Sequence, residues 1–195
     1  DISIMIGANT SDGAGNVTMY AGYREIDAVT SGKRDWNNCA LGGGADAWSC
    51  GGSSTLPQGR FTDFGVLDPN SFDFIVSGTD FVQRQGELYN YQPPNFIQRP
   101  DERYTVGALG HYRFNDAFET YAEISYMDDV SDAQIAPSGA FFVTNTLPCG
   151  NPLLSAQQFQ QLCGQFGLTA ADTQTVYIGR RNVEGGFRTN LTTHT

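Results

Sequence analysis

Two long runs of alternating apolar and polar residues, between Glu102 and Gln134, constrain the fold of this chain more than any other feature. Side chains of a β-strand point to opposite faces in turn, so a period of two residues predicts strands. One face of the first run carries Tyr104, Val106, Ala108, Gly110, Tyr112 and Phe114. The matching face of the second run carries Phe118, Thr120, Ala122, Ile124 and Tyr126. We therefore predict a hairpin with one apolar face and one polar face.

The loop between the two strands decides which residues face each other. A three-residue loop at Asn115-Asp116-Ala117 pairs the apolar residues with one another, for example Phe114 with Phe118. A two-residue loop would move two glutamates, Glu119 and Glu123, onto the apolar face, so we expect the three-residue loop. On the polar face this register predicts three pairs: Arg113 with Glu119, His111 with Tyr121, and Arg103 with Asp129.

A hairpin of this kind fits two folds, a half-buried sheet in a soluble sandwich and the wall of a transmembrane barrel. Soluble strands usually have about five or six residues, whereas a strand that crosses a membrane needs roughly 9 to 11. The alternation here exceeds ten residues on both strands. Aromatic residues lie near both ends of the apolar face, as in the girdles that flank a lipid-facing band. The hairpin pattern by itself leaves both folds open.

Composition excludes some partners. The formal net charge is -10 with only 11 Lys and Arg residues, which argues against nucleic acid, because phosphate binding needs clustered basic residues. No apolar run approaches the 18 or more residues of a membrane helix, and the start at Asp1 does not resemble a signal peptide. We therefore expect the chain to meet a membrane only as part of a barrel.

The four cysteines form two local groups, Cys39 with Cys50 and Cys149 with Cys163, each inside a loop-like stretch. Four cysteines allow three connectivities, and the local one closes two short loops. Each bridge would contribute about 3 kcal/mol through loop entropy. A metal site is the alternative, but no CxxC spacing occurs and both histidines are distant in sequence. We expect two disulfides, and hence an oxidising compartment.

Further segments repeat the hairpin pattern at shorter length. Residues 1–9 and 17–24 alternate on either side of the turn-forming residues 12–16, which predicts a second hairpin with a short turn. Residues 60–65 and 72–82 predict shorter strands, and residues 173–188 alternate again.

Two long loops, at about residues 30–59 and 136–172, separate these strands. The second contains a capping box at Ser155 and Gln158, followed by apolar residues at helical spacing, which predicts a short helix pinned by Cys163. Short turns thus alternate with long, disulfide-stapled loops. Outer-membrane barrels have tight periplasmic turns and long extracellular loops, so this asymmetry favours the barrel over the sandwich.

Several stretches of the chain resemble a known family. Residues 88–104, LYNYQPPNFIQRPDERY, and residues 133–138, AQIAPS, resemble the barrel region of bacterial outer-membrane TonB-dependent receptors. Residues 15–23 resemble a barrel hairpin of the same group, and residues 50–54 resemble its loop. The resemblance covers most of the chain and does not identify a substrate.

The resemblance implies an all-β fold of antiparallel hairpins that form a transmembrane β-barrel wall, with residues 1–195 as a partial barrel segment. Such receptors resemble plugged barrels of about 22 strands. The family implies import of a scarce nutrient, of the siderophore, cobalamin or carbohydrate class. The partners implied are outer-membrane lipid and TonB, the latter through a plug domain that is absent from this sequence, as is a signal peptide. The loops are expected to be extracellular.

An alternative starts from the same strands. An incomplete wall leaves a first and a last strand with unpaired backbone groups, and exposed edges recruit other strands. The chain would then be a processed β-rich fragment whose open sheet pairs with copies of itself, giving an extracellular filament or amyloid-like fibre with a structural role. A third reading, a soluble secreted sandwich that binds carbohydrate, requires a second sheet to cover the apolar face within the same chain.

The sequence offers few candidates for a chemical site, and we expect neither enzymatic activity nor a cofactor. Asp128, Asp129 and Asp132 do not follow the spacing of a calcium loop, so a solvated strand end is the better interpretation and no metal is expected. Aromatic and basic residues in or beside the loops are the candidates for ligand binding. These are Trp36, Trp48, Tyr89, Tyr91 and Arg99.

Overall fold

The computed structural model describes residues 1–44, 47–184 and 187–194, and the protein is mostly β, with 51% strand and one short α-helix. The chain divides into two compact units. The sheet unit comprises Asp1–Thr30, Phe96–Gln134 and Arg188–Thr195. The core unit comprises Ser31–Asn95 and Ile135–Phe187. The all-β prediction is confirmed at this level, and the sheets are antiparallel; no closed barrel is formed by the part of the chain that the structure describes.

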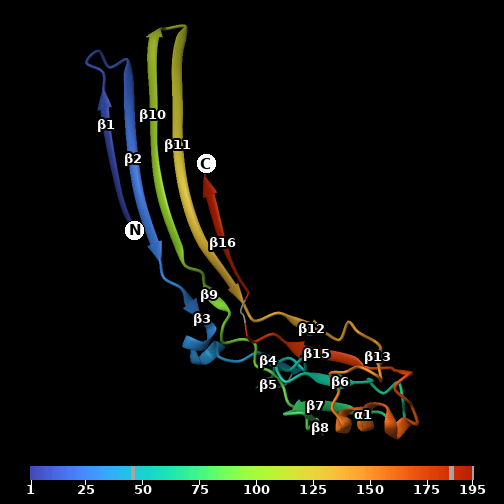
Figure 1. Ribbon diagram of the computed structural model, residues 1–195. Helices are drawn as coiled ribbons and strands as arrows, with labels where there is room; N and C mark the ends of the chain where they lie inside the picture. Colours follow the sequence, from blue (N-terminus) through green and yellow to red (C-terminus); the bar gives the residue numbers. More distant parts are fainter. Residues whose placement is uncertain (45–46, 185–186, 195) are drawn as a thin grey trace. The chain divides into compact units, whose positions relative to one another are not determined.

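The sheet unit is built around one five-stranded sheet in the order β1-β2-β10-β11-β16 (Figure 1). The strands are β1 (Ile2–Asn9), β2 (Gly15–Ile26), β10 (Asp101–Asn115), β11 (Phe118–Ile135) and β16 (Phe187–His194). Their order in the sheet is their order in the chain, and the first three neighbouring pairs are antiparallel. A two-stranded sheet of β3 (Val29–Thr30) and β9 (Phe96–Gln98) completes the unit. These strands thus form an up-and-down meander.

The long hairpin has the predicted register but not the predicted loop. Val106 pairs with Tyr126 and Arg103 with Asp129, as expected. The turn, however, has two residues, Asp116 and Ala117, and the register shifts between Arg113 and Asn115. This bulge adds one residue to β10, which restores the alternation that a two-residue turn alone would reverse. Glu119 and Glu123 therefore stay on the polar face, and the rings of Phe114 and Phe118 lie 5.5 Å apart.

The first hairpin closes as predicted through a short turn between β1 and β2. Thr10 and the backbone amide of Ala14 both donate hydrogen bonds to Asp12, at 2.6 and 3.0 Å. Gly13 takes a φ of 68°, a left-handed conformation that glycine adopts without strain. Both short turns lie at one end of the sheet, whereas the long connections leave from the other end (Figure 1). Short turns and long connections therefore alternate along the strands of this sheet.

The core unit holds a second five-stranded sheet in the order β12-β15-β6-β7-β8. Its strands are β12 (Gly139–Phe141), β15 (Tyr177–Arg181), β6 (Arg60–Thr62), β7 (Asp73–Ser77) and β8 (Asp80–Gln83). Two further pairs join β4 (Leu41–Gly44) to β5 (Ala47–Cys50) and β13 (Leu147–Pro148) to β14 (Thr173–Gln174). The regions expected to be long loops therefore contain short strands, which pair either locally, as β4 does with β5, or with more distant segments, as β12 does with β15.

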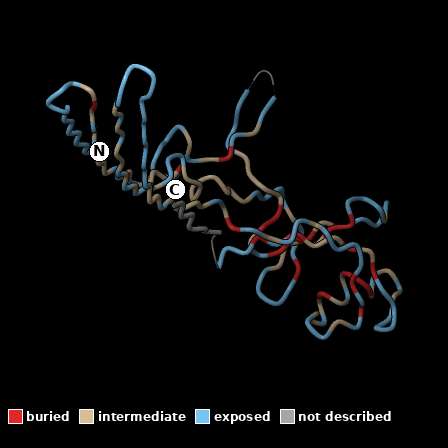
Figure 2. The backbone as a smooth tube through the Cα atoms, turned by 90° about the horizontal axis from the view of Figure 1, so that it is seen from above, coloured by how far each residue is buried: buried red, intermediate tan, exposed pale blue. Residues whose placement is uncertain are grey.

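The buried apolar residues gather in the core unit, where Figure 2 shows most of the buried backbone. Phe72, Phe74 and Phe81 from one hairpin pack with Leu162 and Val176. The helix α1 (Ala156–Leu162) supplies Leu162 and begins at the predicted capping box. The Ser155 hydroxyl accepts a hydrogen bond from the Gln158 amide, and the Gln158 side chain accepts one from the Ser155 amide. Among the described residues no helix combines the length and apolar character needed to cross a membrane.

Both predicted disulfides are present with the local connectivity. Cys39 and Cys50 are joined with their Cα atoms 5.5 Å apart, and Cys149 and Cys163 with theirs 6.0 Å apart. The first bridge closes the β4–β5 hairpin, and Cys50 is exposed. The second ties β13 to the end of α1, and both of its cysteines are buried in the core.

Candidate membrane-facing surface

Rows of apolar side chains run across four strands of the sheet unit. Antiparallel register aligns the residues of one face from β1 to β11. One row consists of Ile4, Ala21, Val106 and Tyr126. The next row consists of Ile6, Met19, Ala108 and Ile124. We call this surface the apolar face of the sheet.

Within the described part of the sheet unit, no segment covers the apolar face. Ile4, Ile6 and Ile124 are 60%, 66% and 74% exposed, and the strands that carry them lie among the exposed parts of the backbone in Figure 2. Isoleucine is among the residues most often fully buried in folded proteins. A continuous exposed apolar surface of this kind marks contact with another protein or with a membrane.

Aromatic rings lie at both ends of the apolar face. At one end the rings of Tyr23 and Tyr104 are 4.9 Å apart, and at the other Phe114 contacts both Tyr112 at 4.9 Å and Phe118 at 5.5 Å. Ten residues of strand from Tyr104 to Phe114 span about 34 Å. For a strand tilted by about 40°, this corresponds to a height of about 26 Å, close to the roughly 25 Å apolar band of outer-membrane strands.

The opposite face of the sheet is polar and carries charged pairs. Arg103 donates to Asp129 at 2.9 Å, and Arg24 lies 3.6 Å from Asp101. The Tyr20 ring covers Gly107, its register partner on β10. The predicted neighbours His111 and Tyr121 are register partners as well. The sheet therefore separates an apolar surface from a hydrogen-bonding one.

The structure does not bring the five candidate ligand-binding residues together. Trp36 and Trp48 are exposed on separate short elements of the core unit, and Arg99 is exposed in the sheet unit. Tyr89 and Tyr91 do share a partner, because the Arg181 guanidinium lies over both rings at 5.4 and 6.0 Å. The sequence analysis did not predict this contact, because no sequence pattern indicates that β15 lies beside the segment that contains Tyr89.

Asp129, one of the acidic residues near the end of the long hairpin, is paired with an arginine of the neighbouring strand. In the described part of the chain, no three His, Cys, Asp or Glu side chains come together as metal ligands. Asp129 is instead engaged by Arg103. In this part of the sheet, oppositely charged side chains of neighbouring strands form ion pairs.

Comparison with known proteins found no match to a family model, a curated protein or a solved structure.

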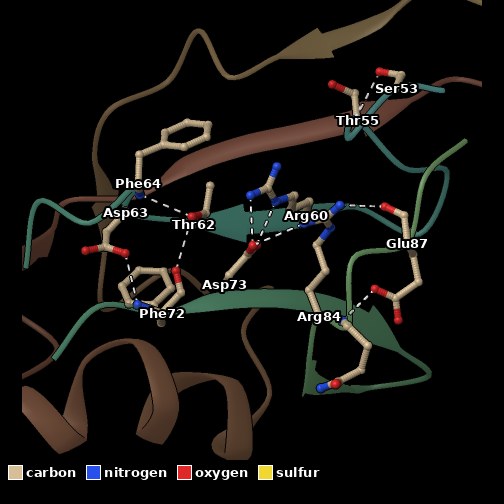
Figure 3. A network of polar contacts seen from close by, with 11 residues as sticks. Ser53, Thr55, Arg60, Thr62, Asp63, Phe64, Phe72, Asp73, Arg84 and Glu87 are labelled. Atoms are coloured by element: carbon tan, nitrogen blue, oxygen red, sulfur yellow. Dashed lines mark hydrogen bonds and ion pairs between the residues drawn. The ribbon is translucent and has the colours of Figure 1, made fainter. Parts of the chain in front are cut away.

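The sequence analysis also did not predict a network of charged side chains in the core unit. Arg60 on β6 donates from Nε and Nη2 to the two carboxylate oxygens of Asp73 on β7, at 2.6 and 2.8 Å. Arg84 approaches the same carboxylate from the end of β8, with Nη1 3.4 Å from Oδ2 (Figure 3). Such bidentate pairs are strong and fix geometry. They depend on pairing of β6, β7 and β8, and the sequence pattern alone did not reveal it.

Asp63 lies beside this network and organises the segment that joins β6 to β7. It is fully buried, and one of its oxygens accepts a hydrogen bond from the backbone amide of Phe72 at 2.9 Å (Figure 3). The other oxygen accepts one from the backbone amide of Leu67 at 2.7 Å. A buried carboxylate is tolerated when backbone N–H groups satisfy it. Asp63 therefore has a structural role and is not available to a ligand.

Proposed function

We propose that the sheet unit is part of the lipid-facing wall of a bacterial outer-membrane receptor of the TonB-dependent kind. The observation that carries the proposal is the exposed apolar face bounded by aromatic rings at both ends. Burial of one isoleucine side chain is worth about 1.5–3 kcal/mol, so a whole face left in water would cost many times that amount. Lipid covers such a face without any further protein.

The connections between strands support the same proposal. β10 and β11 have 15 and 18 residues, more than a membrane crossing requires. Neighbouring strands in the sheet follow the order of the chain, as in up-and-down barrels, and the short turns share one end. The core unit would then consist of the long connections between strands, which are extracellular in such barrels.

The receptor as a whole would import a scarce nutrient with energy passed on by TonB, which would contact a plug domain. The resemblance of residues 88–104 to the barrel region of these receptors supports this role. The polar face of the sheet would line the lumen around the plug, because alternate residues of a barrel strand face inward.

Self-assembly into a filament is the second candidate. It is favoured by β1, which pairs with β2 along one edge and has no partner strand along its other edge in the described part of the chain. Strand edges of this kind template pairing with further chains. In a filament the apolar face would pack against another copy of the chain instead of against lipid.

Spin labels on the two faces distinguish these candidates. Ile124→Cys places a label on the apolar face, and Glu123→Cys, its neighbour on β11, serves as the matched control on the polar face. In the outer membrane or in reconstituted lipid, we expect the label at 124 to be relaxed by dissolved oxygen and the label at 123 by a water-soluble nickel complex. Protection of position 124 from both reagents would reject the lipid-facing wall and favour a protein-covered filament.

A further inference from the structure

One edge of the sheet in the core unit is closed by a side chain instead of a strand. β8 is the last strand in the order β12-β15-β6-β7-β8, and in the described part of the chain β7 is its only partner strand. Gln157 Oε1 accepts a hydrogen bond from the Phe81 amide at 2.9 Å, and Gln157 Nε2 donates one to the Phe81 carbonyl at 3.0 Å. A neighbouring strand would bond to the same two backbone groups. Gln157 therefore takes the place of a strand at Phe81.

The helix that carries Gln157 is fixed at both ends. α1 has seven residues and begins at the capping box described above, one residue before Gln157. At its other end Leu162 is buried in the core, and the adjoining Cys163 is bonded to Cys149. The position of Gln157 along β8 is thus set by the packing of the whole helix.

Without this contact the edge of β8 would be open to pairing. Free N–H and C=O groups along a strand edge recruit further strands, and proteins commonly prevent this with charged residues or proline. Phe81 and Val82, in the middle of β8, are neither, and Val82 is 42% exposed. The sequence of α1, AQQFQQL, contains no charged residue either. Protection of the middle of this edge therefore depends on the Gln157 amide.

The strand that fits this edge best is β8 of a second copy. Phe81 and Gln83 direct their backbone groups to the same side of β8, away from β7, because alternate residues of a strand do so. If Phe81 pairs with Gln83 of an antiparallel second copy, both residues of both chains exchange hydrogen bonds. The same register places Asp80 of each copy opposite Arg84 of the other, so the charges at the ends of the edge are complementary. Such an interface is self-complementary, as a two-fold symmetric dimer requires.

We propose that Gln157 is an autoinhibitory contact that prevents two copies of the chain from joining their core-unit sheets through β8. Loss of the Gln157 amide converts the edge of β8 into a dimer interface. Every contact in this argument lies within the core unit, so the inference does not depend on the membrane proposal. It also differs from the filament candidate, which uses the edge of β1 in the sheet unit.

Hydrogen exchange of the intact protein tests whether Gln157 holds the edge. Gln157→Leu removes both amide groups and keeps most of the side-chain bulk, and Gln160→Leu, an exposed position on the same helix, is the matched control. In dilute solution we expect the Phe81 amide to exchange at least about tenfold faster in Gln157→Leu, because its hydrogen-bond acceptor is lost. The control should exchange as wild type does.

Sedimentation velocity over a series of protein concentrations tests whether the freed edge pairs. We expect Gln157→Leu to form a dimer at concentrations at which wild type and Gln160→Leu do not, and the Phe81 amide to regain protection as the dimer forms. Asp80→Lys in the Gln157→Leu background should abolish the dimer, since the lysine would face Arg84 of the second copy. Gln157→Asn, whose shorter amide cannot reach both groups of Phe81, supplies the same readouts if Gln157→Leu does not fold.

Three results would overturn the inference. The first is unchanged exchange at Phe81 when Gln157 is replaced, which would show that the amide does not hold the edge. The second is faster exchange without any added association, which would show that the edge does not pair. The third is association that Asp80→Lys leaves unchanged, which would place the contact between copies elsewhere on the molecule.

Discussion

Tyr20 occupies the space that a side chain at Gly107 would need. A Cβ added at Gly107 would overlap the Tyr20 ring, whereas one at Gly110 on the same strand would have neighbours no closer than 3.4 Å. We therefore expect Gly107→Ala to displace the outer end of the Tyr20 ring and to destabilise the sheet by about 1 kcal/mol, the low end of the range for overpacking. Gly110→Ala is the control and should leave stability unchanged or slightly raised. Denaturant unfolding of both variants checks this, and equal stabilities would contradict the role given to Tyr20.

We expect the folding stability of the core unit to depend on the ionisation of Asp172 at acid pH. Both the amide and the hydroxyl of Thr169 donate to its carboxylate at 2.7 Å, which lowers the pKa of Asp172 below its usual 3.8. Because the folded pKa is depressed, the stabilisation is fully present above the unfolded pKa and is lost as the pH falls through the folded one. Wild type should exceed Asp172→Asn in thermal stability at neutral pH, and the gap should close as the pH falls below 3.8, the usual pKa of an aspartate. A gap that does not narrow in acid would refute this.

Among the elements, the two disulfide-closed segments differ in their access to solvent. Cys50 is exposed at the end of β5, whereas Cys149 and Cys163 are 2% and 0% exposed. Thiol exchange requires the attacking thiolate to reach a sulfur atom. Under mild reduction of the folded protein we expect Cys39 and Cys50 to become alkylated first, while Cys149 and Cys163 stay protected until the core unit unfolds. Mass spectrometry of alkylated peptides checks the order, and simultaneous labelling would contradict it.

Elements differ as well in how far the sequence predicts them. The alternation in β10 and β11 fixes their faces, because period two persists for many residues and survives the bulge near Phe114. The bulge itself was missed, since a three-residue loop and a two-residue turn with a bulge produce the same pattern. The order β12-β15-β6-β7-β8 was not predictable either. Its strands have only three to five residues, and their neighbours are often distant in the chain.

The polar network beside β6 and β7 depends on contacts that the sequence pattern does not predict. In the sequence, Phe64 has the pattern of an ordinary apolar strand residue. Only the structure shows that its φ angle is positive. Arg60 and Asp73 are thirteen residues apart and meet only because β6 and β7 are paired. The candidate residues chosen from the sequence were four aromatic residues near loops and Arg99. Two of the aromatic residues, Tyr89 and Tyr91, instead contact the Arg181 guanidinium.

At the scale of the whole molecule, the proposed membrane wall requires the two faces of the sheet to respond differently to a charge. A lysine or arginine on the lipid face of an outer-membrane strand costs about 2–4 kcal/mol at the middle of the bilayer, whereas residues on the inner face tolerate charge. Ile124 belongs to a central row of the apolar face, and the neighbouring Glu123 lies on the polar face. We therefore expect Ile124→Arg to lower folding stability in lipid by about 2–4 kcal/mol, and Glu123→Arg to have much less effect.

The same pair of variants also separates lipid contact from a water-exposed sheet. If the apolar face met water in the working protein, Ile124→Arg would be neutral or stabilising, because it would remove exposed apolar surface. Unfolding by urea in reconstituted vesicles, monitored by heat-modified electrophoretic mobility, gives both stabilities under one condition. A larger loss for Glu123→Arg than for Ile124→Arg would invert the assignment of the faces, and with it the proposed orientation of the sheet in the membrane.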